Sequence, residues 1–278
     1  MGFFVVLFGS VLWVIGQAMG YGAEWVWFAL GLSLLTNIGS LYWGDQIILT
    51  MSGARPADRK RDFDFFTVTE NLAIAAGIPK PKLYVIDDTA MNAFATGRDP
   101  NHAIVVATSG ILARLERREL EGVIAHELSH IRNYDIRLMV IITVLAGTIA
   151  FITDWFLRSL WWGGRRDREN RGGIFLLIGI VFAILSPLVA TIMKLALSRQ
   201  REYLADASGA LLTRYPEGLA RALEKLKGDR EVLEAATNAT AHLYITNPFK
   251  GKEFSAWFAG LFDTHPSIDD RIKKLRAM

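Results

Sequence analysis

The residues of this chain that are best suited to chemistry lie in the run His126-Glu127-Leu128-Ser129-His130. Histidines four positions apart lie one above the other on a helix, so both imidazoles can bind one metal ion. Glu127 lies beside them and can take a proton from a water molecule on that ion. The spacing predicts a helix that carries two ligands and the general base of a metallopeptidase.

The alternative for this run is a charged, solvated helical turn. The same helix carries an apolar stripe that consists of Leu120, Ile124, Leu128 and Ile131. Such a stripe predicts that the helix packs into a core. A histidine on a packed helix needs a polar partner, because burying an unpaired polar group is unfavourable. The stripe therefore favours a metal site over a solvated turn.

A catalytic zinc ion usually has three protein ligands and one open position for water, so the two histidines need a third partner. The chain contains no Cys, and this ligand must therefore offer nitrogen or oxygen. Glu202 is the strongest candidate. Its polar segment comes soon after the apolar stretch 174–193, just as the motif helix comes shortly before the apolar stretch 138–153. The other candidates are nearby acidic residues and His102, His242 and His265.

Asp206 lies four residues after Glu202, on the same face of the predicted helix. It can accept the free N–H of a ligating imidazole while Glu202 binds the ion. The alternative for Glu202 is an ordinary surface pair with Arg199, three residues before it. The spacing alone leaves both interpretations open.

Four stretches contain no Asp, Glu, Lys, Arg or His, namely residues 1–23, 25–44, 138–153 and 174–193. With a hydrophobic content of 51% and a mean hydropathy of +0.25, they argue against an ordinary soluble enzyme. A helix needs about 20 apolar residues to cross a membrane, and we expect four transmembrane helices. The stretch 138–153 is shorter, so a buried or re-entrant helix is its alternative. The first stretch lacks the basic start of a signal peptide, which favours an uncleaved hairpin.

These stretches divide the chain into four parts. They are a transmembrane hairpin (1–44), a polar block (45–137), a second membrane pair with an Arg-rich loop (138–193) and a second polar block (194–278). Neither polar block is large enough to form a comfortable enzyme alone. We expect one split protease domain, with the motif helix in the first block and the third zinc ligand in the second. The expected fold class is α+β and predominantly helical, with four transmembrane helices and a gluzincin-like domain that contains a small sheet.

Periodicity and helix-breaking residues predict the elements of the two polar blocks. Helices are expected at residues 62–76, from 116–119 onward through the motif, and at 198–212, 217–227, 229–242 and 267–276. Short β-branched runs predict strands at residues 82–86 and 103–107. Residues 92–97 are expected to form a connection.

Basic residues predict on which side of the membrane the site lies. The loop of the first hairpin carries only Glu24, whereas residues 55–61 are rich in Arg and Lys. We therefore expect a multi-pass protein of the cell (inner) membrane, with its active site facing the cytoplasm. The Arg-rich loop at 163–172 would then be external, against the rule. The net charge is +3, and the basic residues gather at the edges of the apolar stretches. This placement favours the lipid bilayer as a partner and argues against nucleic acid.

The motif run, flanked by membrane stretches and followed by Ser198-Arg199-Gln200-Arg201-Glu202-Tyr203-Leu204-Ala205-Asp206-Ala207, closely resembles the HtpX heat-shock membrane metalloprotease family, relatives of the CaaX prenyl protease. Residues 92–97 and 264–267 match two further motifs of that family, and the match follows essentially the whole chain in order. The resemblance implies that His126, His130 and Glu202 bind one Zn2+ and that Glu127 is the catalytic glutamate. It also implies a role in stress response and protein quality control.

In such a site zinc lowers the pKa of its bound water toward about 7, and Glu127 takes the proton and passes it to the leaving amine. His265 or Tyr203 is expected to donate to the tetrahedral oxyanion. The alternative for His265 is a helix-entry residue before Pro266. The resemblance places Asn92 beside the cleft, where it is expected to bind substrate backbone, and an ordinary turn residue is the alternative.

The position of the site limits the substrate. Counting helical residues from the apolar stretches puts the metal on the order of 10 to 15 Å from the hydrocarbon edge. We expect an endopeptidase that cuts cytoplasmic, juxtamembrane or unfolded parts of misfolded or damaged membrane proteins. An extended substrate is expected to add as a strand to an exposed sheet edge at residues 103–107.

Two other classes of protein compete with this one. The first is a catalytically inactive membrane adaptor whose structural zinc site is closed by a fourth protein ligand, so that Glu127 would be dispensable. The second is an intramembrane protease or a transporter, whose ligands would lie within the apolar stretches. Those stretches hold only Gln17, Asn37 and hydroxyl residues as polar side chains, which argues against it.

Overall fold

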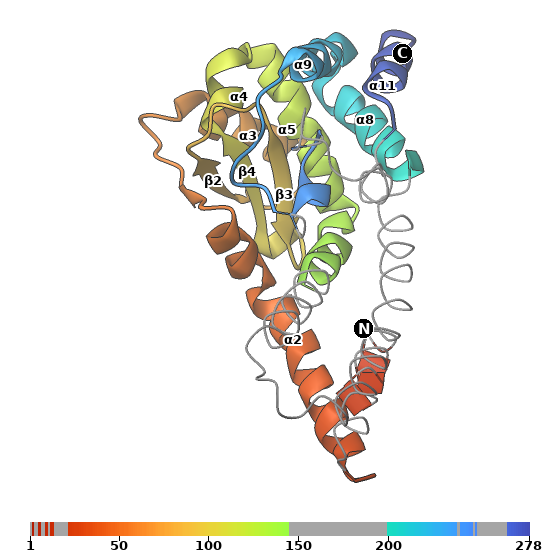
Figure 1. Cartoon of the computed structure of the whole chain (residues 1–278). Helices are drawn as coiled ribbons and strands as arrows, with labels where there is room; N and C mark the ends of the chain where they lie inside the picture. The colour runs from red at the N-terminus through yellow and green to blue at the C-terminus, as the bar shows by residue number, and fades with distance from the viewer. Residues whose placement is uncertain are drawn as a thin grey trace, which may run out of the picture.

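In the computed structural model of the chain, the described residues are 22–144, 199–237, 240–246, 248 and 266–278, together with isolated helical positions between 2 and 13. The helices are α2 (Trp25–Met51), α3 (Phe63–Ala76), α4 (Ser109–Arg114), α5 (Arg117–Arg132), α8 (Arg199–Thr213), α9 (Pro216–Gly228) and α11 (Ile268–Arg276) (Figure 1). The strands are β1 (Arg55–Pro56), β2 (Lys82–Ile86), β3 (Ala93–Gly97) and β4 (Ala103–Thr108), and two 3-10 turns are η1 (Pro100–His102) and η2 (Ala241–Leu243). Residues 135–144 are also helical.

The strands form one mixed sheet in the order β1-β2-β4-β3. β2 and β4 run parallel, with Val85 opposite Ala107. β3 is antiparallel to β4, with Ala95 opposite Val105, and β1 is antiparallel to β2. β4 therefore lies inside the sheet, and β3 is the edge strand on its far side.

The two faces of the sheet pack into two different cores, because successive side chains of a strand point to opposite faces. One face carries Ala93 and Ala95 and belongs to the core shared with α3, α5, α9 and α11. The other face carries Phe94 and Val106 and packs against the end of α2 and against Tyr244, whose ring meets that of Phe94 edge-on at 5.0 Å. The small alanine side chains allow α5 to lie close to β3.

α5 is the central helix of the domain and contacts α3, α8, α9 and β3. It begins with a capping box, in which Glu116 accepts a bond from the backbone of the first turn and Glu119 accepts one from the backbone of Glu116. Lys225 of α9 binds the Glu119 carboxylate at 2.6 Å. The helix that carries the motif is thus held by elements that precede and follow it in the chain.

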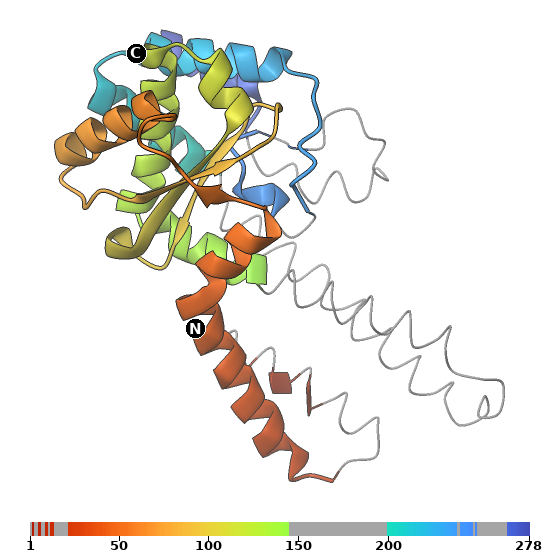
Figure 2. The same cartoon turned by 90° about the vertical axis from the view of Figure 1, so that its left-hand side faces the viewer.

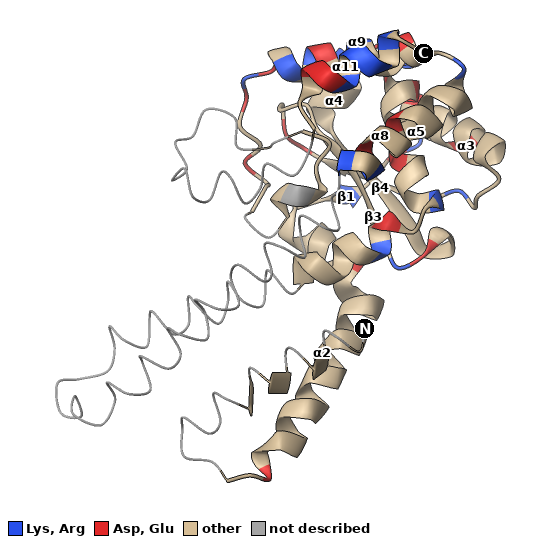
Figure 3. Ribbon diagram, turned by 90° about the vertical axis from the view of Figure 1, so that its right-hand side faces the viewer, with Lys and Arg blue, Asp and Glu red and all other residues tan. Residues whose placement is uncertain are grey.

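α2 extends away from the sheet as one long helix (Figure 2). In the part of the chain that the structure describes, it is the one helix that is long and apolar enough to cross a membrane, with a mean hydropathy of 1.3. Only 22% of its most apolar window is buried, and Trp27, Leu35 and Trp43 are among its exposed side chains. Charged residues gather on the sheet domain, whereas α2 is almost free of them (Figure 3).

Most of the elements predicted for the polar blocks are confirmed. The helices expected at 62–76, 198–212, 217–227 and 267–276 correspond to α3, α8, α9 and α11 with shifts of one residue, and the motif helix is α5. Gly77 ends α3 in the left-handed conformation, with φ of 68°. The strand predicted at 82–86 is β2.

Two predictions about the sheet are wrong. Residues 93–97 form β3 and not a connection, because pairing with β4 supplies the backbone hydrogen bonds that an alanine-rich segment needs to be extended. The strand predicted at 103–107 is confirmed as β4, but it lies between β2 and β3 and so offers no exposed edge.

The helix predicted at 229–242 is also wrong over the described residues 229–237, which contain one turn but no helix. Tertiary contacts compete with the helical propensity of this segment. The Asp229 carboxylate accepts a bond of 2.8 Å from the backbone N–H of Met91, and the N–H of Leu233 donates to the carbonyl of Pro248 at 3.0 Å. Asp229 therefore ends α9 instead of starting another helix.

The four predicted membrane stretches are described only in part. The stretch 25–44 is helical within α2, and residues 138–144 are helical. The stretch 174–193 and the rest of 138–153 lie outside the described residues, as does most of 1–23. The described chain is a predominantly helical protein with a small mixed sheet.

Candidate metal centre

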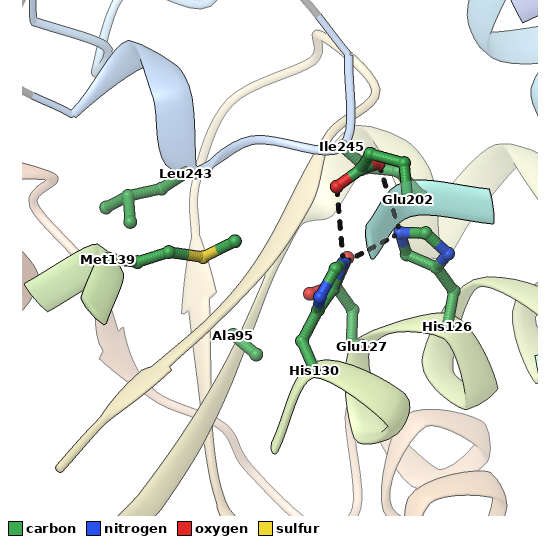
Figure 4. A pocket seen from close by; sticks show the side chains of 8 residues that line it. All are labelled: Ala95, His126, Glu127, His130, Met139, Glu202, Leu243 and Ile245. Atoms are coloured by element: carbon green, nitrogen blue, oxygen red, sulfur yellow. Dashed lines mark hydrogen bonds and ion pairs between the residues drawn. The ribbon is translucent and has the colours of Figure 1, made fainter. Parts of the chain in front are cut away.

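Three buried side chains from two helices converge beside β3. His126 and His130 come from α5 and Glu202 from the first turn of α8 (Figure 4). The Nε2 atoms of the two histidines are 3.2 Å apart. Glu202 places Oε2 3.7 Å from Nε2 of His126 and Oε1 3.5 Å from Nε2 of His130. The three residues that the sequence predicted as ligands are thus brought together.

The spacing of these four atoms, two imidazole nitrogens and the two oxygens of one carboxylate, fits a tetrahedral zinc ion. With bonds of about 2.0–2.1 Å, two ligand atoms of such an ion lie about 3.3 Å apart. The separations of 3.2, 3.5 and 3.7 Å are close to that value without any rearrangement of the helices. One nitrogen from each imidazole and one carboxylate form a donor set that zinc accepts.

The hydrogen bonds of the two imidazoles also fit a cation between them. Each ring has an aspartate at its Nδ1 atom, which favours a proton on Nδ1 and a lone pair on Nε2. Two such lone pairs would face each other and the Glu202 carboxylate, and a metal ion can bind both of them together with that carboxylate.

His126 is held from behind by Asp206 and Arg271. Oδ1 of Asp206 lies 2.9 Å from Nδ1 of His126, as the sequence predicted for the free N–H of a ligand. Arg271 of α11 donates to both oxygens of that carboxylate, at 2.7 and 2.9 Å. Although burial alone would raise it, Arg271 and His126 hold the pKa of Asp206 down at about 2. Asp206 therefore remains an anion that fixes the His126 ring.

His130 is held in the same way by Asp135 and Arg201. Oδ2 of Asp135 lies 3.0 Å from Nδ1 of His130, and its other oxygen forms an ion pair with the guanidinium of Arg201. Each imidazole therefore contacts an aspartate, and that aspartate in turn contacts an arginine. The two arginines differ in their surroundings, because the side chain of Arg271 is 1% exposed and that of Arg201 is 44% exposed.

Glu127 lines the same cavity as the three ligands. The remaining lining residues are apolar and consist of Ala95, Met139, Leu243 and Ile245. Met139 and Leu243 lie on the opposite side of the cavity from the ligands (Figure 4). Burial raises the pKa of the Glu127 carboxyl above its usual range, although the two imidazoles oppose this. A carboxyl group with a raised pKa, beside a metal-binding set, binds a proton more readily than an ordinary glutamate, as a general base must.

Asn92, the predicted substrate-binding residue, is buried and engaged with the protein itself. Its Nδ2 donates to the carbonyl of Thr246 at 3.1 Å, and its Oδ1 accepts from the backbone N–H groups of Ala93 and Thr246. These bonds fasten the segment 240–246 to the start of β3. Binding of substrate by Asn92 stays a prediction, next to this structural role.

The two predicted oxyanion donors are placed differently. The ring of Tyr203 lies under the ammonium group of Lys274, 3.2 Å from the ring centroid, and is not among the residues that line the cavity. His265 lies outside the described residues, as does the side chain of His242. His102 is exposed and binds Asp99 through Nδ1 at 2.8 Å, away from the cavity. The donor to the oxyanion therefore stays a prediction.

Sequence reasoning missed three residues of this centre: Asp135, Arg201 and Arg271. A signal for Arg271 is present, because it occupies a core-facing position on α11 among Ile268, Ile272 and Leu275. Asp135 carries no comparable signal, since positions five apart do not face each other on a continuous helix.

A family model, Peptidase family M48, matches residues 60–278 of the chain. Proteins described as Protease HtpX homolog are similar over nearly the whole length. One from Caldanaerobacter subterraneus subsp. tengcongensis is 46% identical, with 99% of this chain and 93% of that relative covered. One from Streptococcus uberis is 44% identical, with 99% and 95% covered. One from Dictyoglomus thermophilum is 51% identical, with 84% and 75% covered.

A solved structure shares the fold at lower sequence identity. The crystal structure of Ste24p from S. mikatae superimposes with a TM-score of 0.54 and 21% identity. The match covers 96% of this chain and 61% of that one, so this chain spans less than two thirds of the length of its structural neighbour. The similarity supports the arrangement of sheet and helices described above.

Proposed function

The chain belongs to peptidase family M48 and is an HtpX-type metalloprotease, and from this premise we propose that it is a membrane-embedded zinc endopeptidase. Its substrates would be misfolded or damaged membrane proteins and unfolded polypeptides, cut from the cytoplasmic side of the cell membrane. The observation that supports the chemistry best is the convergence of His126, His130 and Glu202 within 3.2 to 3.7 Å, with Glu127 in the same cavity.

In this proposal His126, His130 and Glu202 hold the zinc ion. Bound there, zinc would supply a Lewis acid and lower the pKa of a water molecule. Glu127 takes a proton from the attacking water and later gives it to the nitrogen of the leaving amine. The raised pKa makes Glu127 a better base toward the attacking water, and the proton that it gains is then available to the leaving amine. Asp206 keeps the His126 imidazole oriented during the reaction.

The substrate is proposed to bind along β3, the edge strand beside the cavity, instead of along β4 as the sequence suggested. Ala95 of β3 lines the cavity together with Glu127. The N–H of Ile245 already donates to the carbonyl of Ala93 at 3.0 Å, so the start of this edge is in use. An extended peptide would pair with the following positions of β3. Main-chain bonds would then provide affinity with little dependence on sequence, which suits a protease of unfolded chains.

Membrane embedding is supported by α2. Large apolar side chains of this helix are exposed to an extent that water would not favour, with Trp27 at 74% and Leu35 at 68%. The helix is 27 residues long and bears no charge between Trp25 and Gly44. A lipid environment would cover this surface. The cytoplasmic orientation rests on the basic residues that follow α2, by the positive-inside rule.

The two polar blocks are proposed to act as one domain. α5 belongs to the first block and contacts α8 and α9 of the second. The ligand set also takes residues from both blocks, since His126 and His130 precede the segment 138–193 and Glu202 follows it. Neither block alone would contain the proposed metal centre.

The decisive experiment compares Glu127→Gln with Glu121→Gln, two changes on the same helix. Zinc content and cleavage are measured for both with a detergent-solubilised membrane protein and a soluble unfolded protein. We expect Glu127→Gln to retain zinc and to lose cleavage by a factor of about 10²–10⁴. Glu121 forms only an ion pair with Arg117, and its variant should remain active.

Cleavage retained by Glu127→Gln would refute the assignment of the base and favour the inactive adaptor with a structural zinc site. Cleavage confined to loops on the external side of the membrane would refute the proposed orientation instead. The two results are independent, because the first concerns chemistry and the second concerns topology.

A further inference from the structure

We propose that Asp135 is a positioning residue of the metal centre, which holds His130 in place and connects it to Arg201 at the start of α8. This inference rests on the proposed zinc site. It assigns a role to two residues that lie outside the ligand set and the general base.

A break in the helix after α5 places Asp135 beside His130. Five residues advance a continuous helix by about 500°, which leaves the two side chains about 140° apart around the axis. α5 ends at Arg132, and Tyr134 adopts the left-handed conformation with φ of 61° before a new helix begins at residue 135. A tyrosine is unfavourable there, since only Gly and occasionally Asn or Asp adopt this conformation readily. The turn places the Asp135 carboxylate 3.0 Å from Nδ1 of His130.

Both oxygens of the Asp135 carboxylate are used. Oδ2 binds His130, and Oδ1 binds Arg201. The side chain is 4% exposed, so its charge depends on these two partners. An aspartate at a helix start commonly caps backbone N–H groups, but the bonds of this one go to a ligand imidazole and to a guanidinium.

The aspartate–arginine pairs behind His126 and His130 differ in the burial of the arginine and in the number of its hydrogen bonds to the aspartate. On the His126 side, Arg271 is fully buried and donates twice to Asp206. On the His130 side, Arg201 is half exposed and reaches Asp135 from the first turn of α8, one residue before Glu202. The orientation of His130 therefore depends on the position of α8 relative to the turn at Tyr134. A displacement of either segment would change the orientation of the His130 imidazole.

The test measures metal binding by the full-length protein in detergent. Zinc affinity is obtained by competition with a chelator, and the absorption spectrum of the Co2+ form reports ligand geometry. Asp135→Asn should weaken zinc binding by about 10–100-fold and alter the cobalt spectrum. Arg201→Gln should produce a smaller loss in the same direction, and Arg201→Lys should restore most of it. Asp64→Asn is the matched control, because Asp64 is exposed and pairs only with Arg117.

Wild-type affinity and an unchanged cobalt spectrum in Asp135→Asn would overturn the proposal and leave the proposed function intact. If Asp135→Asn fails to fold, Arg201→Gln decides, since a half-exposed side chain can be replaced without disturbing the core. Unchanged affinity and spectrum in Arg201→Gln would then count against the proposal. Absence of zinc binding by the wild-type protein would instead refute the proposed function itself.

Discussion

Gly209 of α8 lies directly against the backbone of His126 on α5. A Cβ atom on residue 209 would come within 3.1 Å of the His126 amide nitrogen and 3.3 Å of the carbonyl carbon of Ala125. Glu202 lies seven residues, or about two helical turns, before Gly209 and therefore on the same face of α8. The close crossing at Gly209 is what allows the Glu202 carboxylate to reach the two imidazoles.

Gly209→Ala is expected to weaken zinc binding while changing the stability of the metal-free protein little. The new methyl group pushes α8 away from α5 by a few tenths of an ångström, which moves Glu202 from the histidines. Overpacking costs about 1–3 kcal/mol, but alanine gains about 1 kcal/mol over glycine in a helix. Chelator competition and thermal unfolding measure the two effects. Gly228→Ala is the control, since no atom lies within 4 Å of its added Cβ. Equal zinc affinities for both variants would contradict this prediction.

Arg271→Met is expected to destabilise the metal-free protein by about 3–5 kcal/mol, because it leaves the buried carboxylates of Asp206 and Glu202 without their cation. Arg276→Met, five residues later on α11, removes partly exposed ion pairs with Glu217 and Glu224 and should have a much smaller effect. Chemical unfolding of both variants in the same detergent checks the difference. Similar losses for the two would show that the buried guanidinium does not stabilise the centre.

Removal of zinc by a chelator is expected to abolish cleavage and to lower the temperature of unfolding. A ligand that binds only the folded state, present at 1,000 times its dissociation constant, stabilises by about 4 kcal/mol. Glu202→Gln should show little of this shift, because the variant lacks a charged ligand. Thermal unfolding with and without zinc measures both. If the unfolding temperature of the wild-type protein is the same with and without zinc, the ligand assignment is contradicted.

Asn92→Ala is expected to cost about 1–3 kcal/mol of stability, because it leaves the buried backbone groups of Thr246 unpaired. Asn101→Ala, at an exposed position in η1, is the control. Steady-state cleavage then separates the two roles considered for Asn92. A rise in KM, which loss of folded protein alone does not cause, would support substrate binding, and an unchanged KM would leave the structural role alone.

The two histidine ligands could be predicted from the sequence because their spacing follows helical geometry, whereas the assignment of Glu202 as the third ligand came from the family resemblance. His126 and His130 share a face of α5, and Glu202 and Asp206 share a face of α8. The capping residues Glu116 and Glu119 and the left-handed Gly77 likewise mark helix ends by local rules. These features depend on neighbours in the chain, and the structure confirms the helices at both sites.

The remaining features depend on contacts between distant segments. β3 is extended because β4 lies beside it, although its alanines have little preference for a strand. The segment after Asp229 is not helical because Met91 and Pro248 bind it. Asp135 reaches His130 only because the helix breaks at Tyr134. None of these contacts has a periodicity that could be recognised before the fold is known.

The position of Arg271 also has a consequence for how the protein is made. Arg271 and His126 are 145 positions apart in the chain, yet they lie 3.4 Å from each other. A ribosome synthesises the ligands long before it synthesises this arginine, and domains fold as their residues emerge. Until synthesis has passed residue 271, Asp206 and Glu202 lack the cation that their burial requires. We expect the nascent chain to be inactive as a protease during that interval.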